Sequence, residues 1–419
     1  MEHVSSATTL AVGTGLSANV DPLLAAEQAC EQTLTGVTQG QVDLALVFVS
    51  GAHIEELEPI LAHVRSTLEP GTLVAVSAEG VIGGDVELER QSGLSVFAAS
   101  LPGTSIQPFL YRDLPHVRED DAEALADAAR IVGARRDLRG ILFFADPFSV
   151  PAAAAVQTLS SVRGAVEGLK RSPVAGGMAS GSAKPGGNVL ALNDQTMRAG
   201  GVGVTIRGAI DLDTVVSQGC RPIGRPHVVT SAQRNIIKTL GGERALDVLH
   251  DTISALEPEE RELVQGGVFF GRVIDEYKSR FGRGDFLVRG VFGADKKAGA
   301  IAVGDMVRPG QTIQFHLRDS KTAAEDLQLL LAAQQLQHPP AGGLLMTCNG
   351  RGSRLFSEPH HDARTISRAL GRDEEHPMPL SGLFAAGEIG PIGDSSFLHG
   401  HTASLVLFRP RRRVHDAED

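Results

Sequence analysis

The sequence lacks the residues on which several classes of protein depend. Its 419 residues include no Trp, 2 Tyr and 3 Cys, with a formal net charge of −11. The scarcity of rings on which bases stack, together with the negative charge, argues against a nucleic-acid partner. Three cysteines are too few for a disulfide framework and are typical of a reducing compartment, so we expect a cytoplasmic protein.

Membrane and targeting signals are also missing. No apolar run reaches the ~18–20 residues that a membrane-spanning helix needs, so we expect no membrane association. The N-terminal MEHVSSATTLAVG has no basic region followed by an apolar core, and we therefore predict no secretory signal.

The sequence also lacks the short motifs of common enzyme classes. It contains no G-x-x-x-x-G-K-[ST], no G-x-S-x-G, no C-x-x-C and no H-E-x-x-H. A P-loop, a nucleophile elbow and a dedicated zinc site are therefore unsupported. We predict no metal ligands, and composition alone names no cofactor.

What the sequence does have is a regular succession of apolar runs. Hydrophobic residues make up 42% of the chain, and its 48 Gly lie between these runs, as tight turns would require. The order strand, helix, strand and further strands occurs in residues 42–103 and again in residues 140–206. This recurrence predicts an α/β protein built from repeated strand–helix–strand–strand units, with mixed sheets flanked by helices.

The length and one connector predict two domains. The Pro-rich, basic stretch CRPIGRP at residues 220–226 is typical of a link between domains. We therefore expect a first domain over residues 1–220, a second over residues 221–410, and a charged tail over residues 411–419.

The candidate site lies in residues 341–408, where three apolar runs read as strands. Polar side chains stand between these runs, and glycines beside them let the backbone approach a ligand. The candidate ligand contacts are Cys348, Asn349, Arg351, Arg354, Glu388, His399 and His401.

The proposed chemistry of this site is the binding of a small acid or an amino acid. Arg351 and Arg354 could hold a carboxylate through the guanidinium fork, and Glu388 could accept an ammonium group. If the strands before Arg351 and Glu388 are parallel neighbours, both side chains emerge at one sheet edge, beside His399 or His401. The alternative is that the glycines form tight turns and Arg351–Glu388 is a structural ion pair.

The same residues carry a resemblance to a known family. AVSAEGVIGG with DVELE, GLSVFAASLPG and SIQPF in the first half resemble the FIST N-terminal domain. IIKTLGGERALDVL, LLMTCNGRGSRLF, GLFAAGEIGPIG and HGHTASLVLF in the second half are similar to the FIST C-terminal domain. The resemblance covers about residues 9–409. It implies a sensory, signal-transducing protein that binds a small ligand, with amino acids as the usual proposal, and that acts through a signalling partner.

Two alternatives to a simple binding protein stay open. Nearby arginines would favour the thiolate of Cys348, and His399 or His401 with Glu388 could complete a catalytic set in a cytosolic enzyme. Because some relatives in the family bind haem, His399 or His401 could instead be an axial ligand. Since the usual catalytic motifs are missing, we favour a protein that is not an enzyme.

Overall fold

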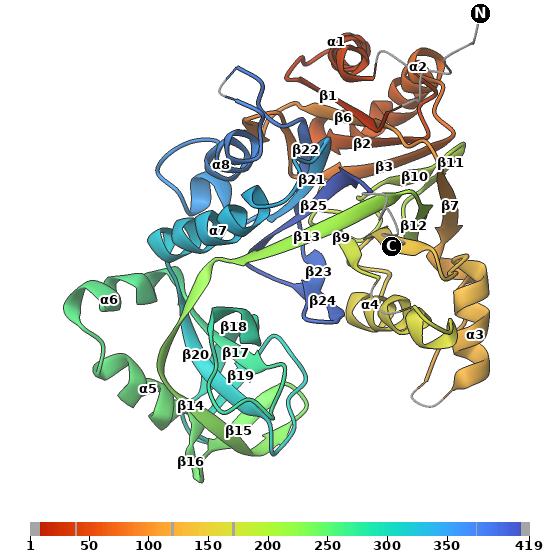
Figure 1. The fold of residues 1–419 in the computed structure, drawn as a ribbon. Coiled ribbons are helices and arrows are strands. Elements are labelled where there is room, and N and C mark those ends of the chain that lie inside the picture. The colour runs from red at the N-terminus through yellow and green to blue at the C-terminus, as the bar shows by residue number, and fades with distance from the viewer. Residues whose placement is uncertain (1–8, 38–39, 119–120, 170–171, 374, 412–419) are drawn as a thin grey trace, which may run out of the picture. The chain divides into compact units, whose positions relative to one another are not determined.

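The computed structural model describes residues 9–37, 40–118, 121–169, 172–373 and 375–411, so residues 412–419 of the predicted charged tail lie outside the described residues. The chain forms two compact units. The first unit comprises Met1–Val216, Leu330–Leu398 and Ala403–Asp419, and the second comprises Ser217–Leu329 and His399–Thr402. Helices and strands alternate through much of the first unit (Figure 1).

Three sheets form the first unit, and each has a mixed strand order. The first sheet contains, in spatial order, β1 (Ala11–Ser17), β6 (Leu94–Ser100), β2 (Leu44–Ser50), β3 (Thr72–Ala78), β10 (Leu190–Leu192) and β11 (Gln195–Met197). The second contains β24 (Ser395–His399), β23 (Glu388–Ile392), β9 (Val174–Met178), β8 (Leu138–Ala145), β12 (Gly201–Gly208) and β7 (Thr104–Leu110). The third contains β13 (Ile210–Gln218), β25 (Thr402–Pro410), β21 (Gly342–Cys348), β22 (Leu380–Ala385), β4 (Gly80–Gly83) and β5 (Val86–Glu89).

Each sheet has one parallel strand pair joined by a crossover. The parallel pairs are β2 with β3, β8 with β9, and β21 with β22. Helices accompany these strands: α1 (Pro22–Gly36), η1 (Gly51–Glu56), α2 (Leu57–Leu68), η2 (Tyr111–Asp113), α3 (Ala122–Ile131), α4 (Ala152–Ser161), η3 (Val162–Ala165), α7 (Ser320–Gln335), η6 (Gly352–Arg354) and α8 (His361–Ala369). The mixed α/β class predicted from the sequence is confirmed, whereas the construction from repeated strand–helix–strand–strand units stays a prediction.

The sheets of the first unit exchange short hairpins with one another. The β4–β5 hairpin follows β3 along the chain but pairs with β22 of the third sheet. The β10–β11 hairpin follows β9 but pairs with β3 of the first sheet, and β23 follows β22 but pairs with β9 of the second. Because each sheet is completed by a hairpin from another, residues 330–398 belong to the same compact unit as the N-terminal part of the chain.

The alternation of apolar residues explains the layering around the sheets. In β2, Leu44, Leu46 and Phe48 belong to a central core that also contains residues of the other two sheets. The intervening Ala45, Val47 and Val49 pack in a separate cluster with residues of α1 and α2. A strand whose two faces are both buried reads as a continuous apolar run, as VDLALVFVS does.

Two local features of the helices follow from the sequence. Asp21 is the N-cap of α1, where its side chain accepts hydrogen bonds from the backbone N–H groups of Leu23 and Leu24, and Pro22 occupies the first helical position. Pro59 lies in the first turn of α2, where its missing N–H costs no intrahelical bond, so the helix continues to Leu68.

The second unit is built on an antiparallel sheet whose strand order closes on itself. Its spatial order is β14 (Cys220–Gln233), β20 (Thr312–Arg318), β17 (Val268–Val273), β18 (Phe286–Asp295), β19 (Ala300–Val303), β15 (Ile236–Leu240) and β16 (Glu243–Arg244), with β14 also pairing with β15. The helices of this unit are α5 (Ala245–Ser254), α6 (Pro258–Leu263), η4 (Val264–Gly266) and η5 (Arg283–Asp285). β14 and β15 pair antiparallel as a hairpin around Arg234-Asn235.

The stretch predicted to be a connector is itself a strand. CRPIGRP opens β14, and Cys220 to Ile223 pair with β20. Pro226 lies where the register shifts between Ile223 and His227, so its missing N–H costs no ladder hydrogen bond. The two domains predicted from the sequence, residues 1–220 and 221–410, stay a prediction. The two compact units have other boundaries, because each contains more than one stretch of the chain.

Candidate functional site

Arg351 lies beyond the end of β21 and is fully buried, with 0% of its side chain exposed. Its Nε and Nη2 atoms donate to the two carboxylate oxygens of Asp362 at 2.6 and 2.9 Å. Burial alone would raise the pKa of Asp362, but the guanidinium of Arg351 holds it well below its usual range. The fork expected to bind a ligand carboxylate is therefore occupied by a carboxylate of the chain itself, and only Nη1 has no partner among the described residues.

Glu87 of the β4–β5 hairpin is buried beside this ion pair. Its Oε1 accepts a hydrogen bond from the N–H of Ala363 at 2.9 Å, and its Oε2 has no partner among the described residues. Burial, followed by the negative charge of Asp362, raises the pKa of Glu87 to about 8. Glu87 is therefore largely protonated at neutral pH, which limits the charge repulsion in the cluster.

Two further acids near this hairpin hold the loop that follows β21. Glu89 accepts hydrogen bonds from the backbone N–H and the hydroxyl of Ser353, both at 2.8 Å. Glu79 forms an ion pair with Arg354 at 2.5 Å, with side chains 28% and 40% exposed. The hairpin exchange thus brings the acids of AEGVIGGDVELE onto the loop CNGRGSRLF, although about 270 residues separate them in the sequence.

Cys348 and Asn349 lie at the carboxyl end of β21. Cys348 is half-buried, within electrostatic range of Arg351 and Arg354, and its Sγ accepts a hydrogen bond from the N–H of Gly350 at 3.4 Å. The Oδ1 atom of Asn349 is buried and has no partner among the described residues. These contacts favour the thiolate of Cys348 over the thiol.

We expect iodoacetamide to alkylate Cys348 in the native protein while Cys30 and Cys220 stay unmodified. Both other cysteines are buried, and burial raises the pKa of Cys30 to about 12. Peptide mass spectrometry of native and unfolded protein measures this selectivity. Modification of Cys30 at the same rate as Cys348 would show that the contacts around Cys348 do not activate it.

The remaining predicted contacts lie on other elements. Glu388 is fully buried and begins β23, where it pairs with Gly177 of β9 in the second sheet. His399 and His401 belong to the second unit, where they line a small cavity with Gln218 and Cys220. The structure therefore brings Cys348, Asn349, Arg351 and Arg354 together in one loop, and it places the histidines in a different compact unit.

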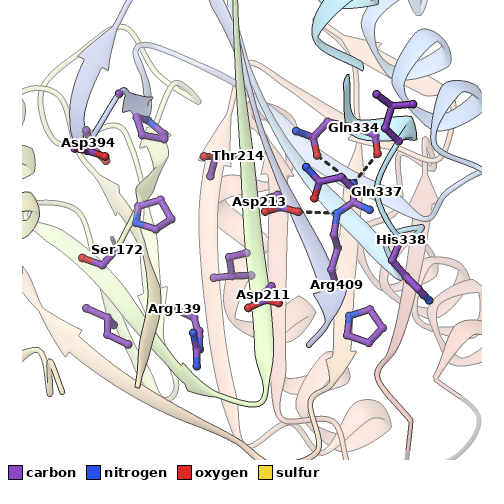
Figure 2. A pocket seen from close by; sticks show the side chains of 18 residues that line it. Arg139, Ser172, Asp211, Asp213, Thr214, Gln334, Gln337, His338, Asp394 and Arg409 are labelled. Atoms are coloured by element: carbon purple, nitrogen blue, oxygen red, sulfur yellow. Dashed lines mark hydrogen bonds and ion pairs between the residues drawn. The ribbon is translucent and has the colours of Figure 1, made fainter. Parts of the chain in front are cut away.

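Another cavity lies elsewhere in the first unit, and we call it the charged pocket. Its volume is about 800 Å³. Figure 2 shows side chains of β13 in the middle of the pocket, with others from the ends of β8, β9, α7 and β25 around them. The polar lining residues labelled there are Arg139, Ser172, Asp211, Asp213, Thr214, Gln334, Gln337, His338, Asp394 and Arg409.

Arg409 supplies a buried positive charge in the charged pocket. Its side chain is 4% exposed, and its Nε lies 2.7 Å from Oδ2 of Asp213. Figure 2 shows Arg409 between Asp213 and Gln334, whose Oε1 accepts from Nη2 at 3.1 Å. The third nitrogen, Nη1, is buried without a partner among the described residues, although buried donors in native proteins normally have an acceptor.

Unused acceptors lie in the same pocket. Asp211, two residues before Asp213 on β13, forms no side-chain hydrogen bond or ion pair with the described residues. Burial and the charge of Asp213 raise the pKa of Asp211. Ser172 has a buried hydroxyl without a partner among those residues. The residues that line the pocket therefore include one guanidinium nitrogen, one carboxylate and one hydroxyl without a partner among the described residues.

Sequence reasoning missed the residues that the structure makes most prominent. Asp362 and Glu87 hold Arg351 in place, and Arg409 and Asp211 give the charged pocket its two signs of charge. The signal for Arg409 was its position at the end of the apolar run SLVLF, where a buried arginine requires a partner. The signal for Asp211 and Asp213 was their i, i+2 spacing on a strand, which places both on one face.

Comparison with known proteins gives the class and the family. The chain combines a mixed α/β fold with a polar pocket in its first unit. The FIST N domain model matches residues 43–243 and the FIST C domain model matches residues 245–391. The chain therefore belongs to the FIST family, whose domains are generally associated with sensory and signal-transduction proteins.

Relatives of similar length occur in mycobacteria. The chain is 39% identical over 399 residues to the uncharacterised protein Rv0628c of Mycobacterium tuberculosis. The matched region covers 95% of this chain and 99% of that protein. It is 37% identical over 399 residues to the uncharacterised protein Mb0898c of Mycobacterium bovis, covering 95% and 98%. Within the described residues, no helix combines the length and the apolar character needed to cross a membrane.

Proposed function

We propose that this protein is a ligand-binding sensory protein whose ligand is an amino acid or a closely similar small zwitterion, held in the charged pocket. The observation that carries the proposal is the buried Arg409, whose Nη1 has no partner, in the same cavity as the unpaired Asp211. A carboxylate of the ligand would accept from Nη1, and its ammonium group would donate to Asp211. The bound protein would then transmit its state to a signalling partner.

The size and polarity of the pocket support a ligand of this class. A cavity of about 800 Å³ admits an amino acid with its side chain. Because Asp213 already neutralises Arg409, a ligand with a single charge would leave one of the two recognition groups unmatched. A zwitterion satisfies both groups without adding net charge to a partly desolvated site.

The role of the sequence-predicted residues as ligand contacts stays a prediction. Arg351 is better explained as a structural residue, because Asp362 fills two of its three nitrogens. Arg354 is 40% exposed and could still reach a ligand. Binding measured in Arg354→Gln separates the two sites, because the charged pocket does not include Arg354.

We expect Asp211→Asn and Arg409→Met each to weaken binding at least about tenfold, since a hydrogen bond to a charged group is worth about 1.5–3 kcal/mol. A thermal-shift screen of the amino acids identifies the ligand, and calorimetry then gives its affinity for each variant. Asp211→Asn is the more decisive variant, because no described residue bonds to that carboxylate and the fold does not depend on it.

The matched control is Asp127→Asn, which removes a carboxylate 54% exposed on α3. It should leave the affinity unchanged. Equal affinity in wild type, Asp211→Asn and Arg409→Met would remove the charged pocket from the proposal. Binding that is lost only in Arg354→Gln would move the ligand to the loop after β21.

A further inference from the structure

β13 is a terminal strand of the third sheet, and one of its two edges is open. β25 pairs with it on one side, and no other strand among the described residues pairs with it. The backbone groups of residues 211–214 form no further hydrogen bond within the described part of the chain. Since alternate residues of a strand direct both N–H and C=O to the same side, every second residue here presents a donor and an acceptor at the open edge.

The open edge faces the charged pocket. Four consecutive residues of β13 are half-buried and line the cavity: Asp211, Leu212, Asp213 and Thr214. Successive side chains of a strand point to opposite faces of its sheet, so a cavity that touches all four must lie along the edge of the strand. Figure 2 shows Asp213 and Thr214 on opposite sides of β13. The four residues offer roughly 10 Å of edge, which is the length of a short partner strand.

Two other terminal strands of the first unit have edges that the chain itself occupies. In β1, the N–H of Leu16 donates to Oε1 of Gln32 on α1 at 2.9 Å. In β5, the N–H of Glu87 donates to Nδ1 of His360 at 3.0 Å. Proteins cover such edges because a row of unpaired N–H and C=O groups is a template for pairing with another chain. The edge of β13 has no such cover from the described residues, and it opens into a cavity instead.

The side chains beside the open edge define the strand that fits there. Asp213 is paired with Arg409 at 2.7 Å, whereas Asp211 on the same face of β13 has no partner among the described residues. A basic side chain of a neighbouring strand would be attracted to Asp211. On the opposite face, Leu212 packs against Gly140, so an apolar side chain is favoured there. The edge therefore fits a strand in which basic and apolar residues alternate.

We propose that β13 binds an extended segment of a partner protein, with alternating basic and apolar residues, as an additional strand of the third sheet. The backbone N–H and C=O groups of the segment would pair with those of the open edge, and a basic side chain would meet Asp211. The two aspartates would repel acidic segments, which makes the edge selective. This site shares Asp211 with the proposed function, but it goes beyond that function because it uses the backbone of β13 and needs no bound amino acid.

The test uses the full chain and the blocked peptide acetyl-Thr-Lys-Val-Lys-Val-Thr-amide, which has no charged end. With the peptide at millimolar concentration, hydrogen exchange at alternate amides of residues 211–214 should slow at least about tenfold. Two further forms of the peptide carry N-methyl groups on one or the other set of alternate amides. Because only one set of N–H groups faces β13, one form should bind like the unmodified peptide and the other at least about tenfold more weakly by calorimetry.

The controls separate strand addition from other modes of binding. Asp211→Asn should weaken the binding of the lysine peptide, and a peptide with Glu in place of both Lys should bind more weakly to wild type. Asp127→Asn, which removes an exposed carboxylate on α3, should leave the affinity unchanged. Unchanged exchange in residues 211–214, or equal affinity of the two methylated forms, would overturn the proposal. Because the ends of the peptide are blocked, this outcome is independent of whether an amino acid binds between Asp211 and Arg409.

Discussion

Asp362→Asn should lower the free energy of unfolding by about 3–5 kcal/mol, because it leaves the guanidinium of Arg351 buried without its counter-ion. The two side chains are 0% and 1% exposed, so water cannot replace the lost carboxylate. The ring of Phe356, whose centroid lies 5.3 Å from Cζ of Arg351, offers only a weak alternative contact. Urea unfolding of wild type and variant measures the loss.

The matched control is Glu79→Gln, which breaks the Arg354–Glu79 pair on the same loop. Those side chains are 40% and 28% exposed, so the expected loss is about 1 kcal/mol or less. The double variant Arg351→Met, Asp362→Leu should recover part of the stability lost in Asp362→Asn, since it removes both buried charges. Equal losses in Asp362→Asn and Glu79→Gln would contradict the assigned role of the buried pair.

The free energy of unfolding of the wild type should fall as pH rises, and Glu87→Gln should make this fall smaller. The pKa of Glu87 is raised from 4.5 to about 8 in the folded state, so the folded protein holds a proton that the unfolded chain releases. The stabilisation is thus fully present below pH 4.5 and is lost as pH rises through 8. At 1.36 kcal/mol for each pKa unit, the effect amounts to at most about 5 kcal/mol.

Unfolding measured at several values of pH between 4.5 and 9 tests this prediction. Wild type should lose stability across this range relative to Glu87→Gln, and the variant should be the more stable protein at pH 9. Glu89→Gln is the control, because Glu89 lies on the same hairpin as Glu87 but forms its hydrogen bonds with the exposed Ser353. Parallel curves for wild type and Glu87→Gln would show that Glu87 is already ionised in the folded protein.

The local elements of this protein could be predicted because neighbouring residues determine them. The run VDLALVFVS forms β2 because both of its faces meet apolar layers, and Asp21-Pro22 begins α1 because one caps the helix and the other needs no N–H bond. The position of Cys348 and Ala385 at the same edge of the third sheet was also predictable. β21 and β22 are parallel neighbours joined by a helix, so their carboxyl ends lie together.

The partners of the polar residues could not be predicted, because they depend on pairings between distant segments. Arg351 was assigned to a ligand, yet its partner Asp362 follows a short loop whose geometry no spacing determines. Glu87 reaches this pair only because β4 pairs with β22, almost 300 residues later. A single sequence contains no local pattern for a hairpin that completes another sheet.

The charged pocket escaped prediction for a similar reason. Its lining residues come from separate stretches between Leu138 and Pro410, and each one alone is an ordinary polar residue at a strand or helix end. Only the assembled unit places the unpaired Asp211 in the same cavity as Arg409.

Ligand analogues test the central claim most directly. Calorimetry on wild type should compare the amino acid that binds with its amide, which lacks the carboxylate, and with its hydroxy acid, which lacks the ammonium group. If Arg409 and Asp211 recognise the two ends, each analogue binds at least about tenfold more weakly. The loss caused by the amide should then largely disappear in Arg409→Met, and that caused by the hydroxy acid in Asp211→Asn. Equal affinity for all three ligands in wild type would contradict recognition of a zwitterion in the charged pocket.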